Sequence, residues 1–291
     1  MILGPTVAQR LLRFVGKLPI PKIEGAYTRL GVIAGGTPRH FSVTFHGLKY
    51  NGRMDQAIDR HIFYFGAYAP AELDFLSVAA RVLRKERGTV TFVDVGANVG
   101  QHSLFMSQHA DRIVAFEPNA VAADQFERNL RLNGVRNTQV IRCALGDVDA
   151  VGTLGSGFEG NHGSRSLLWS LDQSKDTVVS VREAGATLAK TGIGRLDLLK
   201  LDVEGYERKV LVGLGDALQR DRPIILFELI GSDTKGGFTS EDDLRSVLYP
   251  DHCLFTLRGR KKARLATFDW SGEEAVCIPR ELRDQFVGML P

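Results

Sequence analysis

The chain has 291 residues, of which 44% are hydrophobic and 24% are charged, as in an ordinary globular protein. Its net charge of +3 is too small to indicate a nucleic-acid partner, and no stretch is long and apolar enough to cross a bilayer. Cys143, Cys253 and Cys277 are widely spaced, which argues against a disulfide framework and a zinc site. We therefore expect a reducing, cytoplasmic compartment and no bound metal.

Residues 1–54 are predicted to form an extension that precedes a main domain at 55–291. Within residues 1–22, apolar residues at helical spacing lie opposite basic ones: Val7, Leu11, Phe14 and Leu18 against Arg10, Arg13 and Lys17. Such a helix can touch the inner membrane surface, dock on its own domain or contact a second subunit. A peripheral membrane contact and a homo-oligomer therefore both stay open. Phe41 to Phe45 alternates with polar residues and is predicted to be a half-buried strand.

The main domain opens with predicted helices over residues 55–65 and 70–83, separated by a turn that contains Tyr68. The run from Val90 to Val95 has the length and composition of a parallel strand buried on both faces. Asp94 interrupts this run near its carboxyl end. Because open α/β sheets bind ligands outside the carboxyl ends of their strands, Asp94 is placed to accept hydrogen bonds from a ligand.

A tight turn follows this strand and leads into a helix. Gly96 and Gly100 let the chain turn and let a ligand approach the backbone. A second strand, Arg112 to Phe116, ends on Glu117, about 20 residues beyond the first glycine, where nucleotide-binding βαβ units place an acid for the ribose hydroxyls. Asn98 stands where the dinucleotide fingerprint G-x-G-x-x-G has its middle glycine, which counts against a nucleotide-dependent oxidoreductase.

Three further parallel strands are predicted to bring polar residues to the same edge. The third strand, Thr138 to Cys143, precedes Ala144 and Asp147; the fourth, Leu196 to Leu201, precedes Asp202; the fifth, Ile224 to Phe227, precedes Glu228. Glu204 and Glu207 begin the next helix, where the helix dipole favours negative charge, so capping explains part of their presence. The last two strands, at 253–257 and 275–278, are predicted to be an antiparallel pair joined by a basic turn.

The segment at 148–194 is rich in glycine and is predicted to be an insertion that acts as a lid. Long loops inside compact domains are usually functional or disordered, and short apolar runs at 166–169 and 177–181 favour hairpin strands within this one. His162 and Arg165 lie in its glycine-rich part and are candidates to contact a substrate. A solvated loop is the alternative interpretation.

Two motifs resemble those of a known family. Asp-x-Gly-x-Asn-x-Gly at 94–100, with an acid after the second strand, resembles motif I of the class I S-adenosylmethionine-dependent methyltransferases. The stretch from Lys200 to Glu207 resembles the K-x-D-x-E-G-x-E signature of the FkbM family within that class. The resemblance covers about residues 55 to 230. It implies a doubly wound, mostly parallel, seven-stranded Rossmann-like sheet with an antiparallel last strand.

The resemblance also implies an O-methyltransferase that uses S-adenosylmethionine and acts on a hydroxyl of a small molecule or glycan, of sugar or polyketide type. The cofactor site it implies comprises Tyr68, Asp94, Gly96, Asn98, Gly100, Glu117, Ala144, Asp147 and Asp202. Asp202 and Glu204 are candidates for the base or the acceptor clamp, and Glu228 joins His162 and Arg165 as a substrate contact. A nucleotide-cofactor oxidoreductase and a catalytically silent scaffold protein are the alternatives.

Overall fold

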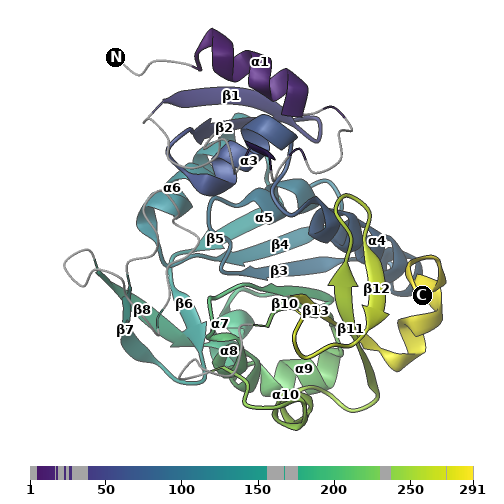
Figure 1. Cartoon of the computed structure of the whole chain (residues 1–291). Helices are drawn as coiled ribbons and strands as arrows, with labels where there is room; N and C mark the ends of the chain where they lie inside the picture. The colour runs from purple at the N-terminus through teal and green to yellow at the C-terminus, as the bar shows by residue number, and fades with distance from the viewer. Residues whose placement is uncertain are drawn as a thin grey trace.

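The computed structural model describes residues 5–16, 18, 23, 26–27, 39–155, 167, 176–229, 237–272 and 274–290. Its centre is an eight-stranded sheet with helices on both faces (Figure 1). In spatial order the strands are β12 (Arg264–Thr267), β11 (His252–Arg258), β13 (Glu274–Pro279), β10 (Ile224–Glu228), β9 (Leu198–Leu201), β3 (Thr91–Val95), β4 (Arg112–Phe116) and β5 (Thr138–Ile141).

The predicted fold class is confirmed, because β10, β9, β3, β4 and β5 pair in parallel and β13 pairs antiparallel to β10. One strand of this central sheet was not predicted. The basic turn after β11 leads into β12, and the chain returns to β13 only after that hairpin. β12 has only four residues and Leu265 is its single fully buried side chain, so its sequence lacks a recognisable strand pattern.

Alternate side chains of each parallel strand belong to two hydrophobic clusters, one on each face of the sheet. Phe92 lies in the first cluster and Val93 in the second, as the two-residue period of a strand requires. Helices α3 (Ala57–Phe65), α4 (Pro70–Arg87), α5 (Gln101–Met106) and α6 (Ala120–Leu132) cover the first face. Helices α7 (Ala184–Lys190), α8 (Glu207–Gly213), α9 (Gly215–Asp221) and α10 (Glu241–Val247) cover the second. A 3₁₀ helix, Arg280–Met289, follows β13.

The N-terminal hairpin of β1 (His40–Phe45) and β2 (Leu48–Arg53) is joined to α6 by two amide side chains. Asn129 accepts a hydrogen bond from the backbone N–H of Asn51 at 2.9 Å, and Asn133 accepts one from Lys49 at 2.8 Å. Phe45 is fully buried in the same cluster as α4 and α5. The predicted extension at 1–54 therefore contributes to the core of the main domain.

Helix α1 (Val7–Gly16) docks on α3 by one side only (Figure 1). Arg13 donates to the carbonyl oxygen of Phe63 at 2.9 Å. The predicted apolar stripe faces solvent instead, with Val7 85% and Phe14 68% exposed. Within the described part of the chain, no helix has the length and apolarity needed to span a bilayer. Contact of this stripe with a membrane surface or a second subunit stays a prediction.

The insertion forms a separate three-stranded sheet of β6 (Ala144–Gly146), β8 (Thr177–Glu183) and β7 (Ala150–Leu154). The strand predicted at 177–181 is confirmed as part of β8, which pairs antiparallel with β7. Residues 156–166 and 168–175, which include His162 and Arg165, lie outside the described residues.

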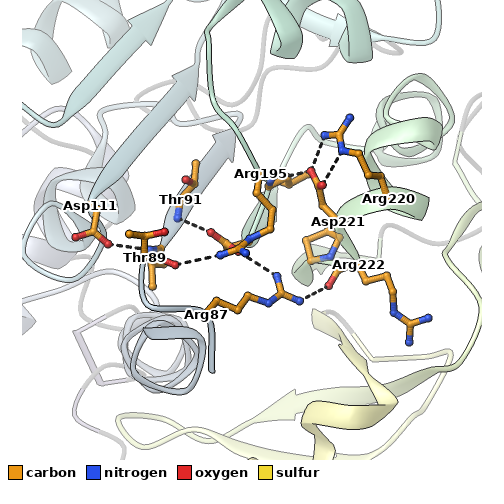
Figure 2. Close-up of polar contacts among 12 residues, drawn as sticks. Arg87, Thr89, Thr91, Asp111, Arg195, Arg220, Asp221 and Arg222 are labelled. Atoms are coloured by element: carbon orange, nitrogen blue, oxygen red, sulfur yellow. Dashed lines mark hydrogen bonds and ion pairs between the residues drawn. The ribbon is translucent and has the colours of Figure 1, made fainter. Parts of the chain in front are cut away.

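The amino ends of the parallel strands are tied together by a network of arginines and aspartates (Figure 2). Asp197, directly before β9, is 1% exposed. It accepts hydrogen bonds from Arg87 at 3.0 Å, Arg195 at 2.5 Å and the backbone N–H of Thr91 at 2.9 Å. Because Thr91 begins β3, this one carboxylate fixes two neighbouring strands and has both of its oxygens satisfied.

Candidate functional site

A cavity lies at the carboxyl ends of the parallel strands, on the edge opposite the arginine network. Its wall includes residues from the ends of β3, β4, β9 and β10, and from the start of the antiparallel strand β13. Eight of the residues predicted for the site line it: Tyr68, Gly96, Asn98, Glu117, Ala144, Asp202, Glu204 and Glu228. Asp94, Gly100 and Asp147 are not among its lining residues, and His162 and Arg165 lie outside the described part of the chain.

The two turn glycines are required by close approaches within the protein. Gly96 has φ +82°, and a Cβ built on it would lie 1.8 Å from the carbonyl oxygen of Asp202. Gly100 has φ +76°, and its Cβ would lie 1.9 Å from the ring of Phe126. A side chain at either position would therefore push apart the turns after β3 and β9, or α5 and α6. The turn holds the cavity wall in place through packing.

Glu117 is 6% exposed and lies at the end of β4. Its two oxygens accept hydrogen bonds from the backbone N–H groups of Asn98 and Asn119, each at 2.7 Å. Burial raises the pKa of Glu117 to about 7, although both hydrogen bonds favour its charged form. Asn98, held at φ 51°, has a buried side-chain oxygen without a hydrogen-bond partner among the described residues. This corner of the cavity therefore offers a carboxylate and an unused amide oxygen to donors of a ligand.

Asp94 lies beneath the turn, whereas Tyr68 lies at the cavity wall. Asp94 is 1% exposed, and one oxygen accepts a hydrogen bond from the hydroxyl of Ser103 at 2.6 Å, so it anchors the start of α5 from beneath the turn. Tyr68 is 39% exposed at the cavity wall. Its backbone is fixed by Gln101, whose amide accepts from the Tyr68 N–H at 2.7 Å and donates to its carbonyl at 2.9 Å.

The other half of the cavity is acidic. Lys200, which is 2% exposed, lies 2.9 Å from a carboxylate oxygen of Asp202. Burial alone would lower the pKa of Lys200, but the charges of Asp202 and Asp94 raise it above its ordinary value. Lys200 is therefore a cation beneath the site, and its ion pair with Asp202 orients that carboxylate.

Glu204 and Glu228 lie beside Asp202, and the three carboxyl groups have oxygens within 4.8 Å of one another. Burial, followed by the charge of Asp202, raises the pKa of Glu204 to about 8 and that of Glu228 to about 9. Glu204 has φ 54°, a left-handed conformation that is uncommon outside glycine and concentrates at functional sites. Glu204 and Glu228 can therefore hold protons near neutral pH and release them as the pH rises.

Glu207 has a structural role, in agreement with the predicted capping. It is 2% exposed and accepts hydrogen bonds from the backbone N–H groups of Val203 at 3.0 Å and Gly205 at 3.3 Å. Burial raises its pKa to about 7. Glu207 thus closes the turn that presents Glu204 to the cavity.

The lining residues that were not predicted from the sequence include Glu72 on α4, His102 on α5 and Glu274 on β13. The imidazole Nε2 of His102 lies 3.1 Å from a carboxylate oxygen of Glu72, and both side chains are largely buried. Glu274 pairs in register with Glu228 across β13 and β10. An available signal was the antiparallel direction of the last strand, which brings its first residue to the edge where the parallel strands end.

This chain is similar in sequence to a known protein family and to several individual proteins. Residues 94–257 match the methyltransferase FkbM domain. "Methyltransferase 1" of Beauveria bassiana is 30% identical over 174 residues, 52% of this chain and 68% of that protein. The 31-O-demethyl-FK506 methyltransferase FkbM of Streptomyces tacrolimicus is 33% identical over 163 residues, 45% of this chain and 61% of its own length. The hexuronic acid methyltransferase AglP of Haloferax volcanii is 29% identical over 147 residues, 49% of this chain and 57% of its own length.

Proposed function

Because this chain belongs to the FkbM family of S-adenosylmethionine-dependent methyltransferases, we propose that it methylates a hydroxyl group of a small molecule or glycan, of sugar or polyketide type. Two relatives are named for acceptors of these classes, one for 31-O-demethyl-FK506 and one for hexuronic acid. The chain spans 61% and 57% of those two proteins, so the acceptor itself is part of the proposal.

The residues at the ends of β3 and β4 and in β6 fit S-adenosylmethionine. The carboxylate of Glu117 can accept hydrogen bonds from the ribose hydroxyls. The side-chain oxygen of Asn98, which has no hydrogen-bond partner among the described residues, can accept another. Ala144 and Leu145 offer apolar contact for the adenine beside this corner. Bound there, S-adenosylmethionine supplies a methyl group activated by a positively charged sulfur.

Asp202 and Glu204 are the proposed catalytic residues. Each can accept a hydrogen bond from the acceptor hydroxyl, align its oxygen for in-line attack and take its proton. Lys200 orients Asp202 through their ion pair, while Glu204, with a pKa of about 8, becomes a competent base as the pH rises through that value. An aliphatic hydroxyl is weakly acidic, so the proton moves late and alignment contributes most of the rate.

The observation that carries the proposal is the order of groups along one cavity. The groups proposed to bind the methyl donor lie at the ends of β3 and β4. Ionisable acids lie at the ends of the neighbouring strands β9 and β10. Two reactants held side by side need such an arrangement. A scaffold protein needs only the groups that bind the cofactor. The dinucleotide fingerprint of a nicotinamide-dependent enzyme has glycine at the position of Asn98.

Calorimetry with S-adenosylmethionine, S-adenosylhomocysteine and NAD tests the proposal. We expect both sulfur ligands to bind with dissociation constants near about 1 μM and NAD not to bind. Binding of NAD alone would identify an oxidoreductase. Binding of the sulfur ligands without methyl transfer to a panel of sugars and polyketide alcohols would identify a silent scaffold.

We place this activity in the cytoplasm. Cys143, Cys253 and Cys277 are all free thiols, and two of them are buried. A reducing compartment suits unpaired cysteines. Fractionation of the source cells, with detection by antibody, tests this assignment.

A further inference from the structure

Two glutamates face each other across the acidic half of the cavity. Glu228 on β10 and Glu274 on β13 are direct partners in the antiparallel register, and both line the cavity. Like charges directly opposite each other destabilise a sheet. Burial raises the pKa of both groups, to about 9 for Glu228. The pair therefore does not contribute to the stability of the sheet.

The nearby basic groups lie against other carboxylates. The ammonium of Lys200 lies 2.9 Å from Asp202, and the imidazole of His102 lies 3.1 Å from Glu72. Among the residues that the structure describes, the buried Oε2 of Glu228 has no hydrogen-bond partner. Hydrogen-bond donors from a ligand would satisfy this oxygen. An anion would meet two carboxyl groups whose neighbouring basic groups, in the part of the chain that the structure describes, already lie against other carboxylates.

The pair lies on the acceptor side of the cavity. Glu117 ends β4, whereas Glu228 ends β10, three strands away in the order β4, β3, β9, β10. Asp202, the proposed base, ends β9 and lies between them. A molecule whose hydroxyl reaches Asp202 from the side opposite the cofactor therefore passes Glu228 and Glu274.

We propose that Glu228 and Glu274 select the acceptor: they accept hydrogen bonds from hydroxyl or ammonium groups and reject an acceptor that carries a carboxylate or phosphate near the reacting hydroxyl. This inference rests on the proposed methyl transfer. It separates the chain from its relative named for hexuronic acid and predicts a neutral or amino-bearing acceptor.

Matched sugars test the charge preference. Methyl glucoside, glucosamine and glucuronate have the same ring and differ in charge, and their binding to the protein saturated with S-adenosylhomocysteine can be followed by calorimetry. We expect methyl glucoside and glucosamine to bind at least about tenfold more tightly than glucuronate, because only glucuronate brings a negative charge to the pair. Equal affinities, a preference for glucuronate, or no binding of either other sugar overturns the proposal.

Substitutions assign the preference to these residues. Glu228→Gln and Glu274→Gln keep the shape but replace an ionisable acid with an amide whose NH₂ group can donate to an anion, so the preference for the other two sugars over glucuronate should fall at least threefold. Glucosamine should bind more weakly to both variants, because its ammonium group favours the ionised acid that they lack. Glu86→Gln, an exposed change on α4, is the matched control and should leave all three affinities unchanged. An undiminished preference in both cavity variants would assign the selection to other groups and contradict the proposal.

Two controls separate the possible failures. If S-adenosylhomocysteine does not bind, the proposed function fails; if it binds and glucuronate is preferred, only the acceptor inference fails. The titrations are repeated with EDTA, because Asp202, Glu204 and Glu228 are close enough to hold a cation. A preference that vanishes with EDTA would show that a metal occupies the acids and would overturn direct selection by the glutamates.

Discussion

At the amino ends of the parallel strands, Asp197 is buried and accepts hydrogen bonds from two arginines and a backbone N–H. At the carboxyl ends, Glu228 keeps a buried oxygen without a partner among the described residues. Carboxyl groups at the two edges of the sheet also differ in the direction of their pKa shifts. Arg84 lowers the pKa of Asp111 at the amino edge, while burial and Asp202 raise the pKa of Glu228 to about 9. The same side-chain chemistry stabilises the sheet at one edge and is left available for ligands at the other.

Removing Asp197 should have the largest effect. Asp197→Ala leaves Arg87 and Arg195 without their shared carboxylate and frees the N–H of Thr91, so we expect a loss of about 3–5 kcal/mol in the free energy of unfolding. Urea denaturation measures it. Glu228→Gln at the opposite edge is the matched control and should not lower stability, because burial already raises the pKa of this carboxyl group. Equal losses in the two variants would erase the distinction between the edges.

Removing the carboxylate of Glu117 should lower the affinity for S-adenosylmethionine. Glu117→Ala deletes charge-assisted hydrogen bonds worth about 1.5–3 kcal/mol, so S-adenosylmethionine should bind about 10- to 150-fold more weakly in calorimetry. Glu86→Ala serves as the control, and circular dichroism checks that the turn around Asn98 survives. Unchanged affinity in a folded variant would move the ribose contact elsewhere.

The proposed catalytic acids should affect turnover more than binding. Asp202→Asn and Glu204→Gln should each lower the rate of methyl transfer by about tenfold or more, since each removes a proton acceptor beside the reacting hydroxyl. The affinity for S-adenosylmethionine should stay within about threefold, because Glu117 is intact. Turnover within twofold of the unmodified protein for both variants would leave positioning, or a bound metal, as the mechanism.

The pH dependence of stability should reveal the acidic edge. Glu228 has a pKa of about 9 when folded and an ordinary value of 4.5, so the folded state holds a proton that the unfolded chain releases. Its contribution to stability is therefore present below pH 4.5 and is lost as the pH rises toward 9. Glu228→Gln removes this loss, so at pH 5.5, one unit above the ordinary pKa, it should be more stable than the unmodified protein by about 1.4 kcal/mol, and nearly equal at pH 3.5. Denaturation at both pH values checks the difference.

The sequence predicted the parallel strands because each is a short apolar run with a polar residue at its end. Glu117, Asp202 and Glu228 could be placed at one edge from that pattern alone. Glu72 and His102 could not, because they come from helices whose rotation is set by packing. The function of Gly100 was also hidden, since the ring of Phe126 that requires it lies some 25 residues away in sequence.

Asp94 shows a second limit of the sequence. Its position near the end of the first strand predicts a ligand contact, which stays a prediction because one of its oxygens is buried without a hydrogen-bond partner among the described residues. The other oxygen accepts a hydrogen bond from Ser103 on α5. The strand pattern could not predict that partner, because the rotation of α5 is set by packing.

The left-handed backbone of Glu204 has a consequence for how this protein can change over time. A residue with a Cβ pays roughly 1–2 kcal/mol in that conformation, and glycine or asparagine would relieve much of it. Mutational drift toward stability therefore leads away from glutamate at this position. Libraries selected only for thermal resistance should accumulate Glu204→Gly and Glu204→Asn, and libraries selected for methyl transfer should retain the strained residue.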